Sequence, residues 1–263
     1  MSETTPSRRY AFGDSPTAAE RLALVAELFD PTSRALLASL AARRPRDVVD
    51  LGCGPGHTTR LLAETLPTAE VVGIDQSAAF LDEARAAGIP RASFRAGDVR
   101  TALPDADLLY ARFVLSHLPE RQVVLAAWLA ALRPGGVLVV EEPEAIETGD
   151  EVFARYLGIT RGLMADRGGD LYVGGALPAT LAALGARSPH DAVRIIDAPT
   201  AHVAIMFGHN LAVWRDDPWV VARHTASALD ALADGLAARR DVPGADRIRW
   251  RLRQVVVARG ALA

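Results

Sequence analysis

The sequence predicts an α/β fold, with a seven-stranded, mostly parallel sheet and helices on both of its faces. First, short apolar runs alternate with helical patterns along the chain, as they do where crossover helices connect parallel strands. Second, the run that ends at Leu51 is short and apolar, which is typical of a strand buried on both faces. Third, Gly52, Gly54 and Gly56 follow this run and lead into a helix, so a ligand can approach the backbone there.

The remaining elements follow from local patterns. Strands are expected at residues 47–51, 71–75, 92–99, 106–110, 137–140, 193–196 and 248–258. Helices are expected to begin at Pro16, Pro31, Thr58 and Pro119, and to cover residues 77–87, 150–167 and 178–184. A long insertion rich in aromatic residues precedes the last strand. We find no repeat, low-complexity tract or linker, so one domain over residues 1–263 is expected.

Composition limits the classes of partner. The chain has 263 residues, of which 50% are hydrophobic and 23% charged, as in ordinary globular proteins. Its net charge of −3 predicts no general attraction to nucleic acid or to an anionic membrane. The single Cys53 excludes an internal disulfide bond, and neither a signal-peptide core nor a run of about 20 apolar residues occurs. A cytoplasmic protein is therefore expected.

The spacing of the glycines indicates which kind of nucleotide they serve. A phosphate-binding loop needs a Lys-Ser/Thr pair where His57 and Thr58 stand, and a dinucleotide fingerprint places its third glycine one residue later. The pattern of Asp50, Gly52, Gly54 and Gly56 resembles motif I of the class I S-adenosylmethionine-dependent methyltransferases of the small-molecule type. On this motif alone, a tight turn without any ligand is the alternative.

The resemblance continues from residue 47 to residue 142 and implies a Rossmann-like sheet with an S-adenosylmethionine site. Leu132 to Gly136, reading LRPGG, matches a further signature of the family. Asp75 ends the second strand 23 positions after Gly52, where a carboxylate can bind a ribose diol or instead cap the next helix. The resemblance also implies cofactor contacts for a further set of residues: Cys53, Gln76 beside the adenine, Asp98 at the motif III position, Val99 and Arg112.

The N-terminal segment is expected to cover the cofactor. In a subset of the family, a Tyr and a Glu-Arg-Leu segment contact the methionine part of the cofactor, and Tyr10 and Glu20-Arg21-Leu22 match that arrangement. An Arg suits a carboxylate, although Arg21 could equally be a solvated surface residue. The resemblance thus divides the domain into a helical cap (1–45), a cofactor-binding core (46–142) and substrate-side helices with the last two strands and a helical insertion (143–263).

Methyl transfer from a sulfonium is an in-line displacement, so a base is needed only where the nucleophile carries a proton. His117 is our first candidate because its ordinary pKa of about 6.5 suits a base near neutrality, although it could merely cap the next helix. Glu142 is the second candidate, beside Glu141. Six residues are candidates for acceptor contacts: Phe29, Phe113, His117, Met206, Phe207 and Trp214. Part of this set could instead belong to the core or to a dimer face. No metal site is expected, since the histidines of the insertion lack carboxylate or Cys companions at zinc spacing.

The predicted function is methyl transfer from S-adenosylmethionine to oxygen, nitrogen or carbon of a small, largely apolar or aromatic metabolite, in bacterial secondary metabolism. The protein would be a monomer or homodimer with no nucleic-acid or membrane partner. The chain lacks the Asn/Asp-Pro-Pro-Tyr/Phe signature of enzymes that methylate amide or exocyclic base nitrogens. Two alternatives remain: a protein that uses the cofactor without transferring its methyl group, and a methyltransferase acting on RNA or protein.

Overall fold

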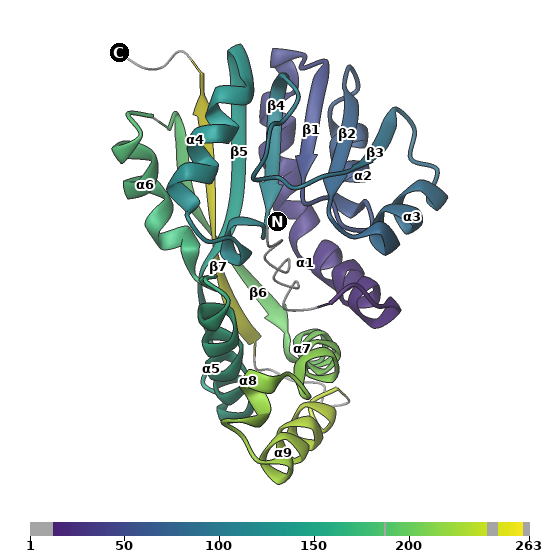
Figure 1. Ribbon diagram of the computed structural model, residues 1–263, viewed down its shortest axis with the longest axis vertical. Coiled ribbons are helices and arrows are strands. Elements are labelled where there is room, and N and C mark those ends of the chain that lie inside the picture. The colour runs from purple at the N-terminus through teal and green to yellow at the C-terminus, as the bar shows by residue number, and fades with distance from the viewer. Residues whose placement is uncertain (1–12, 187, 241–246, 260–263) are drawn as a thin grey trace, which may run out of the picture.

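The computed structural model describes residues 13–186, 188–240 and 247–259, and Tyr10 lies outside them. It confirms the expected fold class (Figure 1). The seven strands lie in the order β3-β2-β1-β4-β5-β7-β6. Their bounds are β1 Asp47–Leu51, β2 Glu70–Asp75, β3 Ala92–Ala96, β4 Ala106–Arg112, β5 Leu132–Glu147, β6 His190–Pro199 and β7 Arg247–Ala258.

The direction of the strands creates one edge at which a ligand can bind. Strands β1 to β5 are parallel, whereas β7 runs antiparallel between β5 and β6. Val49 of β1 pairs with Val72 of β2 on one side and with Leu109 of β4 on the other. The chain therefore leaves β1 in one direction to form β2 and β3, and returns to its other side with β4. In open α/β sheets the ligand crevice lies beyond the carboxyl ends of the strands at this reversal.

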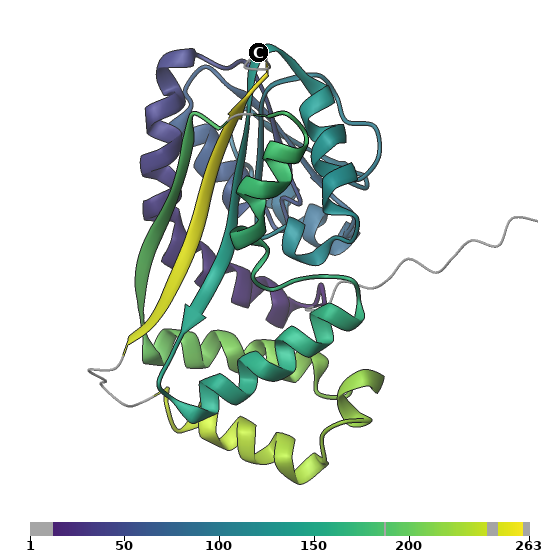
Figure 2. The same cartoon turned by 90° about the vertical axis from the view of Figure 1, so that its left-hand side faces the viewer.

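Helices cover both faces of the sheet, as Figures 1 and 2 show. The helices are α1 Pro16–Leu40, α2 His57–Thr65, α3 Ala78–Ala86, α4 Arg121–Ala131, α5 Glu151–Asp166, α6 Leu177–Ala183, α7 Thr200–Trp214, α8 Pro218–Val221 and α9 Ala226–Ala237. Because side chains alternate along a strand, Val48 packs in the layer beneath α1 and α2, and Val49 packs in the layer beneath α4 and α6. Both faces of the central strands are thus buried.

A separate helical body lies beyond the carboxyl ends of the parallel strands. Figure 2 shows α5, α7 and α9 gathered there, beside the long ends of β5 and β7. Their apolar side chains form one cluster with Val25 and Phe29 of α1, and α7 packs directly on α1. This body forms the wall that faces the ligand edge of the sheet.

Among the elements that differ from the expectation, two have a clear physical reason. The proline at position 31 does not begin a second helix, because α1 continues through it. Val25 and Phe29 before the proline and Leu36 and Leu37 after it are buried in different clusters, and this burial offsets the cost of the missing N–H group. Strand β5 is 16 residues long because it pairs with β7 as far as Glu147. Within the described ranges, we find no helix with the length and apolar character that a bilayer crossing requires.

Candidate active site

The carboxyl ends of β1, β2 and β4 open into a cavity of about 1270 Å³. Its wall is completed by side chains of α1, α5 and α7 and of the segment that follows β4. A pocket for one drug-sized ligand occupies roughly 300–1000 Å³. The cavity therefore has room for more than one ligand.

The glycine-rich turn forms one end of this cavity. Gly52, Gly54 and Gly56 have φ values of 68°, 53° and 92°, a region that side chains rarely adopt. A Cβ at Gly52 would lie 2.8 Å from a methyl group of Val114, and one at Gly56 would lie 3.2 Å from the Cβ of Ala84. A Cβ at Gly54 would have only ordinary contact with Leu22 at 3.5 Å. Gly52 and Gly54 line the cavity, whereas the place of Gly56 is set by packing.

Asp50 has a different position from the one expected. It is 1% exposed and does not line the cavity. Its Oδ2 accepts hydrogen bonds from the hydroxyl groups of Thr58 at 2.6 Å and Thr59 at 2.7 Å. Burial raises the pKa of Asp50 to about 6. Asp50 thus ties the first turn of α2 to the end of β1 and positions the glycine-rich turn without facing a ligand.

Asp75 lines the cavity beside that turn. Its two oxygens accept hydrogen bonds from the backbone N–H of Gly54 at 2.9 Å and of Ser77 at 2.8 Å. Burial raises the pKa of Asp75. The N-cap of α3 is Ser77, whose hydroxyl accepts from the N–H of Phe80. The capping role therefore belongs to Ser77, and each oxygen of Asp75 keeps a second lone pair for a ligand.

The loop after β3 contributes Gly97, Val99 and Arg100 to the cavity wall, but not its acidic residue. Val99 lines the cavity, and its carbonyl accepts a hydrogen bond from the indole of Trp128 at 2.8 Å. Asp98 does not line the cavity. Its carboxylate lies 2.6 Å from Arg100, which lowers the pKa of that carboxyl. The acceptor role expected of Asp98 is not supported by this placement. Gln76 and Cys53, the latter with a pKa raised by burial, do line the cavity.

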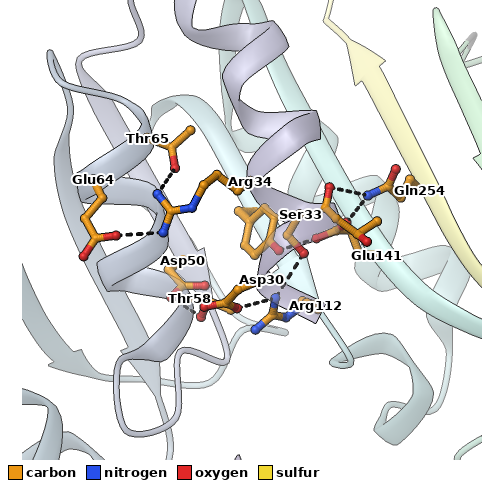
Figure 3. A network of polar contacts seen from close by, with 12 residues as sticks. Asp30, Ser33, Arg34, Asp50, Thr58, Glu64, Thr65, Arg112, Glu141 and Gln254 are labelled. Carbon is orange, nitrogen blue, oxygen red and sulfur yellow. Dashed lines mark hydrogen bonds and ion pairs between the residues drawn. The ribbon is translucent and has the colours of Figure 1, made fainter. Parts of the chain in front are cut away.

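Two arginines occupy the part of the cavity beside α1. Arg21 is 6% exposed, so it is no surface residue, and it lines the cavity. Arg112, at the end of β4, donates to Asp30 at 2.9 Å and to the Ser33 hydroxyl at 3.0 Å (Figure 3). Neighbouring acidic groups raise the pKa of Arg112 against the opposing effect of burial. Arg112 lines the cavity and also fastens α1 to the sheet.

The two carboxyl groups at the centre of β5 do not reach the cavity. Glu141 accepts hydrogen bonds from the hydroxyl of Tyr110 and the amide of Gln254, as part of the network in Figure 3. Glu142 accepts from the backbone N–H of Val114 at 2.7 Å and of Leu115 at 2.6 Å, and burial raises its pKa to about 8. The base role expected of Glu142 is thus not supported. Its carboxyl group instead holds the turn after β4.

His117 lines the cavity, but its pKa is far below the ordinary value of about 6.5 that made it a candidate base. Burial, together with the positive charges of Arg21 and Arg167, lowers this pKa to about 3. At neutral pH the imidazole is uncharged. It can hydrogen-bond a ligand, but it has little affinity for a proton.

The structure brings the expected acceptor-binding residues together. Phe29, Phe113, Met206, Phe207 and Trp214 all line the cavity and also pack in the cluster of the helical body. The rings of Phe29 and Phe113 meet edge to face at 4.8 Å. Phe113 has a φ of 58°, which is strained for a residue other than glycine. This conformation occurs where the chain leaves β4 and enters the cavity wall.

Several lining residues were not expected from the sequence. They are Tyr156, Thr160 and Arg167 on or after α5, Asn210 on α7 and Trp250 on β7. The segments that carry them are distant in sequence, and only their packing brings them together. The one local signal is the four-residue spacing that places Tyr156 and Thr160 on one face of a helix. No group of three or more His, Cys, Asp or Glu side chains suited to a metal ion occurs in the described ranges.

Comparison with known proteins identifies the core of the chain. Residues 49–138 match the family described as "Methyltransferase domain". A trans-aconitate 2-methyltransferase of Methylobacterium radiotolerans is 45% identical over 111 residues, covering 41% of this chain and 42% of the relative. One from Enterobacter sp. is 34% identical over 164 residues, covering 62% and 60%. The chain thus matches less than two thirds of the length of these relatives.

Solved structures extend the likeness to the whole fold. A coclaurine N-methyltransferase bound to N-methylheliamine and S-adenosylhomocysteine superposes with a TM-score of 0.56 at 13% identity. The superposition covers 87% of this chain and 72% of that one. The sheet order and the superposition show that the chain has the class I fold of S-adenosylmethionine-dependent methyltransferases, and residues 49–138 carry the matching domain.

Proposed function

We propose that this protein transfers the methyl group of S-adenosylmethionine to a small, largely apolar molecule. One observation carries the proposal: a single cavity joins the glycine-rich turn and Asp75 at one end to the aromatic side chains of α1 and α7 at the other. A polar nucleoside and an apolar acceptor can therefore lie side by side in it. The relatives named above support the methyltransferase class.

The residues present fit the cofactor. Gly54 leaves its side of the turn open, and Asp75 has free lone pairs beside it for a ribose diol. Arg21, buried in the cavity wall, is the cation we assign to the methionine carboxylate. When bound, the cofactor supplies an electrophilic methyl group on a sulfonium. The chain's part would be to orient the nucleophile toward that group and to exclude water with the helical body. Calorimetry should show binding of S-adenosylhomocysteine and none of NAD.

The cavity favours an apolar acceptor over a polyanion. Three of its arginines already have carboxylate partners: Arg100 pairs with Asp98, Arg112 with Asp30, and Arg167 with Asp217. A tricarboxylate such as trans-aconitate needs several cations that are available to it. The relatives that act on it resemble this chain over only part of their length. We therefore infer that the acceptor differs from theirs, and the acceptor will decide whether the reaction belongs to secondary metabolism.

Where the acceptor nucleophile carries a proton, we expect neither His117 nor Glu142 to remove it. His117 is neutral and can orient an acceptor hydroxyl or amine as a hydrogen-bond partner. Glu142 lies outside the cavity. Acceptors that lose a proton readily, or that carry none, suit this arrangement. Oxygen, nitrogen and carbon nucleophiles all stay within the proposal.

The test uses the purified protein with methyl-labelled S-adenosylmethionine. Separate reactions contain trans-aconitate, a set of simple phenols and aromatic amines, transfer RNA, and a protein extract. Labelled product from the aromatic set alone is the expected result. Labelling of trans-aconitate alone would reassign the acceptor, and labelling of RNA or protein alone would contradict the small-molecule class. Binding without any labelled product would favour a reaction that leaves the methyl group on the cofactor.

A further inference from the structure

Four polar side chains form a patch on the wall of the cavity, inside the helical body. Tyr156 and Thr160 project from α5, and Asn210 and Trp214 project from α7. Each pair is four residues apart, so each lies on one face of its helix. All four line the cavity and are nearly or fully buried, with Asn210 the most exposed at 6%. We call these residues the polar patch.

The polar patch leaves hydrogen-bonding groups without partners. Asn210 donates through Nδ2 to the Tyr156 hydroxyl at 2.6 Å. Three other atoms are buried without a hydrogen-bond partner among the described residues: Thr160 Oγ1, Asn210 Oδ1 and Trp214 Nε1. Burial raises the pKa of Tyr156 to about 12, and the nearby Thr160 hydroxyl and Trp214 N–H act in the opposite direction. Neither of these two groups reaches the Tyr156 hydroxyl with the geometry of a full hydrogen bond.

Such atoms are unusual in this setting. The surroundings are apolar: Phe207 stacks on the Tyr156 ring with centroids 3.9 Å apart, and Met206 lies in the same cluster. A buried polar atom without a partner costs free energy, and most native proteins avoid it. Three of them on one cavity wall, from two helices, indicate that a ligand supplies the missing partners.

The atoms also indicate what kind of group the ligand presents. The indole Nε1 of Trp214 can only donate, the Oδ1 of Asn210 can only accept, and the hydroxyl of Thr160 can do either. A group that completes this set must both donate and accept, and it must be uncharged, since an ionised carboxylate has no proton for Asn210. Hydroxyl and amide groups meet this requirement.

We propose that the polar patch binds an uncharged hydroxyl or amide group of the acceptor and thereby fixes the acceptor's orientation in the cavity. This inference rests on the proposed function in that it takes the ligand of this wall to be the methyl acceptor. Thr160, Asn210 and Trp214 are then specificity-determining residues. The apolar side chains of the cavity wall bind the body of the acceptor, and the polar patch selects one of its substituents.

The test compares two aromatic probes of nearly equal size, 2-naphthol and 2-methylnaphthalene. Calorimetry measures their dissociation constants with protein saturated by S-adenosylhomocysteine. A wholly apolar wall would bind the methyl compound more tightly, because the hydroxyl loses its hydrogen bonds to water. We expect the reverse, with 2-naphthol bound about tenfold more tightly. Its charged analogue, 2-naphthoate, should bind more weakly than 2-naphthol.

Variants connect the preference to the polar patch. Trp214→Phe removes the N–H and keeps an aromatic ring, and Thr160→Val with Asn210→Leu removes the other groups. Each should lose the preference for 2-naphthol, whereas Thr180→Val, at a half-buried threonine of α6 outside the cavity, should keep it. Unchanged affinity for S-adenosylhomocysteine shows that a variant is folded. The Trp214 change alone suffices if the double variant does not fold.

Three results would overturn the inference: equal or tighter binding of 2-methylnaphthalene by the unaltered protein, no binding of 2-naphthol up to its solubility limit, or a preference that survives in folded Trp214→Phe. The assay needs no methyl transfer, so it is separate from the test of function. A clear preference in a protein that labels no acceptor would contradict the proposed function alone. Labelled product without any preference would contradict this inference alone.

Discussion

The guanidinium of Arg112 contacts the carboxylate of Asp30 at 2.9 Å and thereby joins the end of β4 to the middle of α1. The Arg112 side chain is 3% exposed and that of Asp30 is 29% exposed. Ser33, one turn further along α1, accepts a second hydrogen bond from the same guanidinium. Because Arg112 and the neighbouring Phe29 of α1 line the cavity, this pair connects two elements of the cavity wall.

Removal of one partner should cost more than the pair contributes, because it leaves a buried charge. We expect Asp30→Asn to lower the free energy of unfolding by about 2 kcal/mol, since Arg112 stays buried with only a neutral partner. The control is Arg34→Gln on the same helix. Arg34 pairs with Glu64, and both side chains are about half exposed (Figure 3). That change should cost less than about 1 kcal/mol. Denaturant unfolding measures both, and equal losses would show that burial does not govern the pair.

The sequence predicted most of the fold because the relevant signals are local. The glycines, the apolar strand cores and the capping residues Ser15, Ser77 and Asp150 act within a few residues of themselves. The two errors arose where distant parts of the chain decide. Pro31 breaks a local helical pattern, but burial on both sides of it maintains α1. Strand β5 is long because β7, more than a hundred residues later, pairs with it.

The same distinction holds for the candidate site. The glycine-rich turn could be predicted from one local motif, and Asp75 from its position at the end of the next strand. The surroundings of His117 could not, because Arg21 of α1 and Arg167 after α5 set its charge state together with burial. Asp98 pairs with the neighbouring Arg100 and does not line the cavity, which its position in the motif did not indicate. Motifs predict which residues lie near a ligand, and packing decides their protonation and partners.

Gly54 should be essential for cofactor binding, and not merely for folding. Valine there would adopt an unfavourable φ near 53° and place its side chain in the cavity, so affinity for S-adenosylhomocysteine should fall by more than about a hundredfold. Gly88 is a matched control, since its φ of 57° is similar and no atom lies within 4 Å of a Cβ built there. Gly88→Val should lose stability but keep affinity. Calorimetry on both variants separates backbone strain from loss of the ligand space.

Asp75 should contribute directly to the affinity for the cofactor. Asp75→Ala removes an acceptor for the ribose and also frees the N–H of Gly54 and Ser77, so we expect a loss of about ten- to a hundredfold. Asp82→Ala, at an exposed position of α3, is the control and should change nothing. Unaltered affinity in a folded Asp75→Ala protein would show that Asp75 stabilises the turn and does not bind the cofactor.

Glu142 should make the protein less stable as the pH rises. Its pKa is raised from 4.5 to about 8 in the folded state, so the folded protein retains a proton that the unfolded chain releases between these values. The free energy of unfolding should therefore decrease with pH in that window, by at most about 1.4 kcal/mol per pH unit from this group. The decrease between pH 6.5 and 8 reports best on Glu142, because Asp50, with a pKa of about 6, titrates below this range.

Glu142→Gln tests this dependence. The amide oxygen can still accept from the N–H of Val114 and Leu115, and the side chain no longer titrates. We expect similar stability for the two proteins near pH 5 and a more stable variant at pH 8, measured by urea unfolding. Exposed Glu120→Gln should follow the unaltered protein at every pH. A constant difference between Glu142→Gln and the unaltered protein would mean that this carboxyl group keeps an ordinary pKa.

Arg21 should bind only the methionine half of the cofactor. Arg21→Ala is expected to weaken binding of S-adenosylhomocysteine by about ten- to a hundredfold, from the loss of a charge-assisted contact with the carboxylate. Affinity for adenosine should stay nearly unchanged, because adenosine has no carboxylate. Arg34→Ala, on an exposed part of the same helix, should alter neither.

Hydrogen exchange gives an independent measure of the same contact. If Arg21 holds the carboxylate, S-adenosylhomocysteine should increase protection of residues 16–29, and adenosine should increase it much less. In Arg21→Ala the two ligands should give the same weak protection. Equal affinities for S-adenosylhomocysteine in the variant and the unaltered protein would instead show that the first half of α1 only packs on the fold. The carboxylate would then be held by another group of the cavity, and α1 would act as a fixed wall of the site.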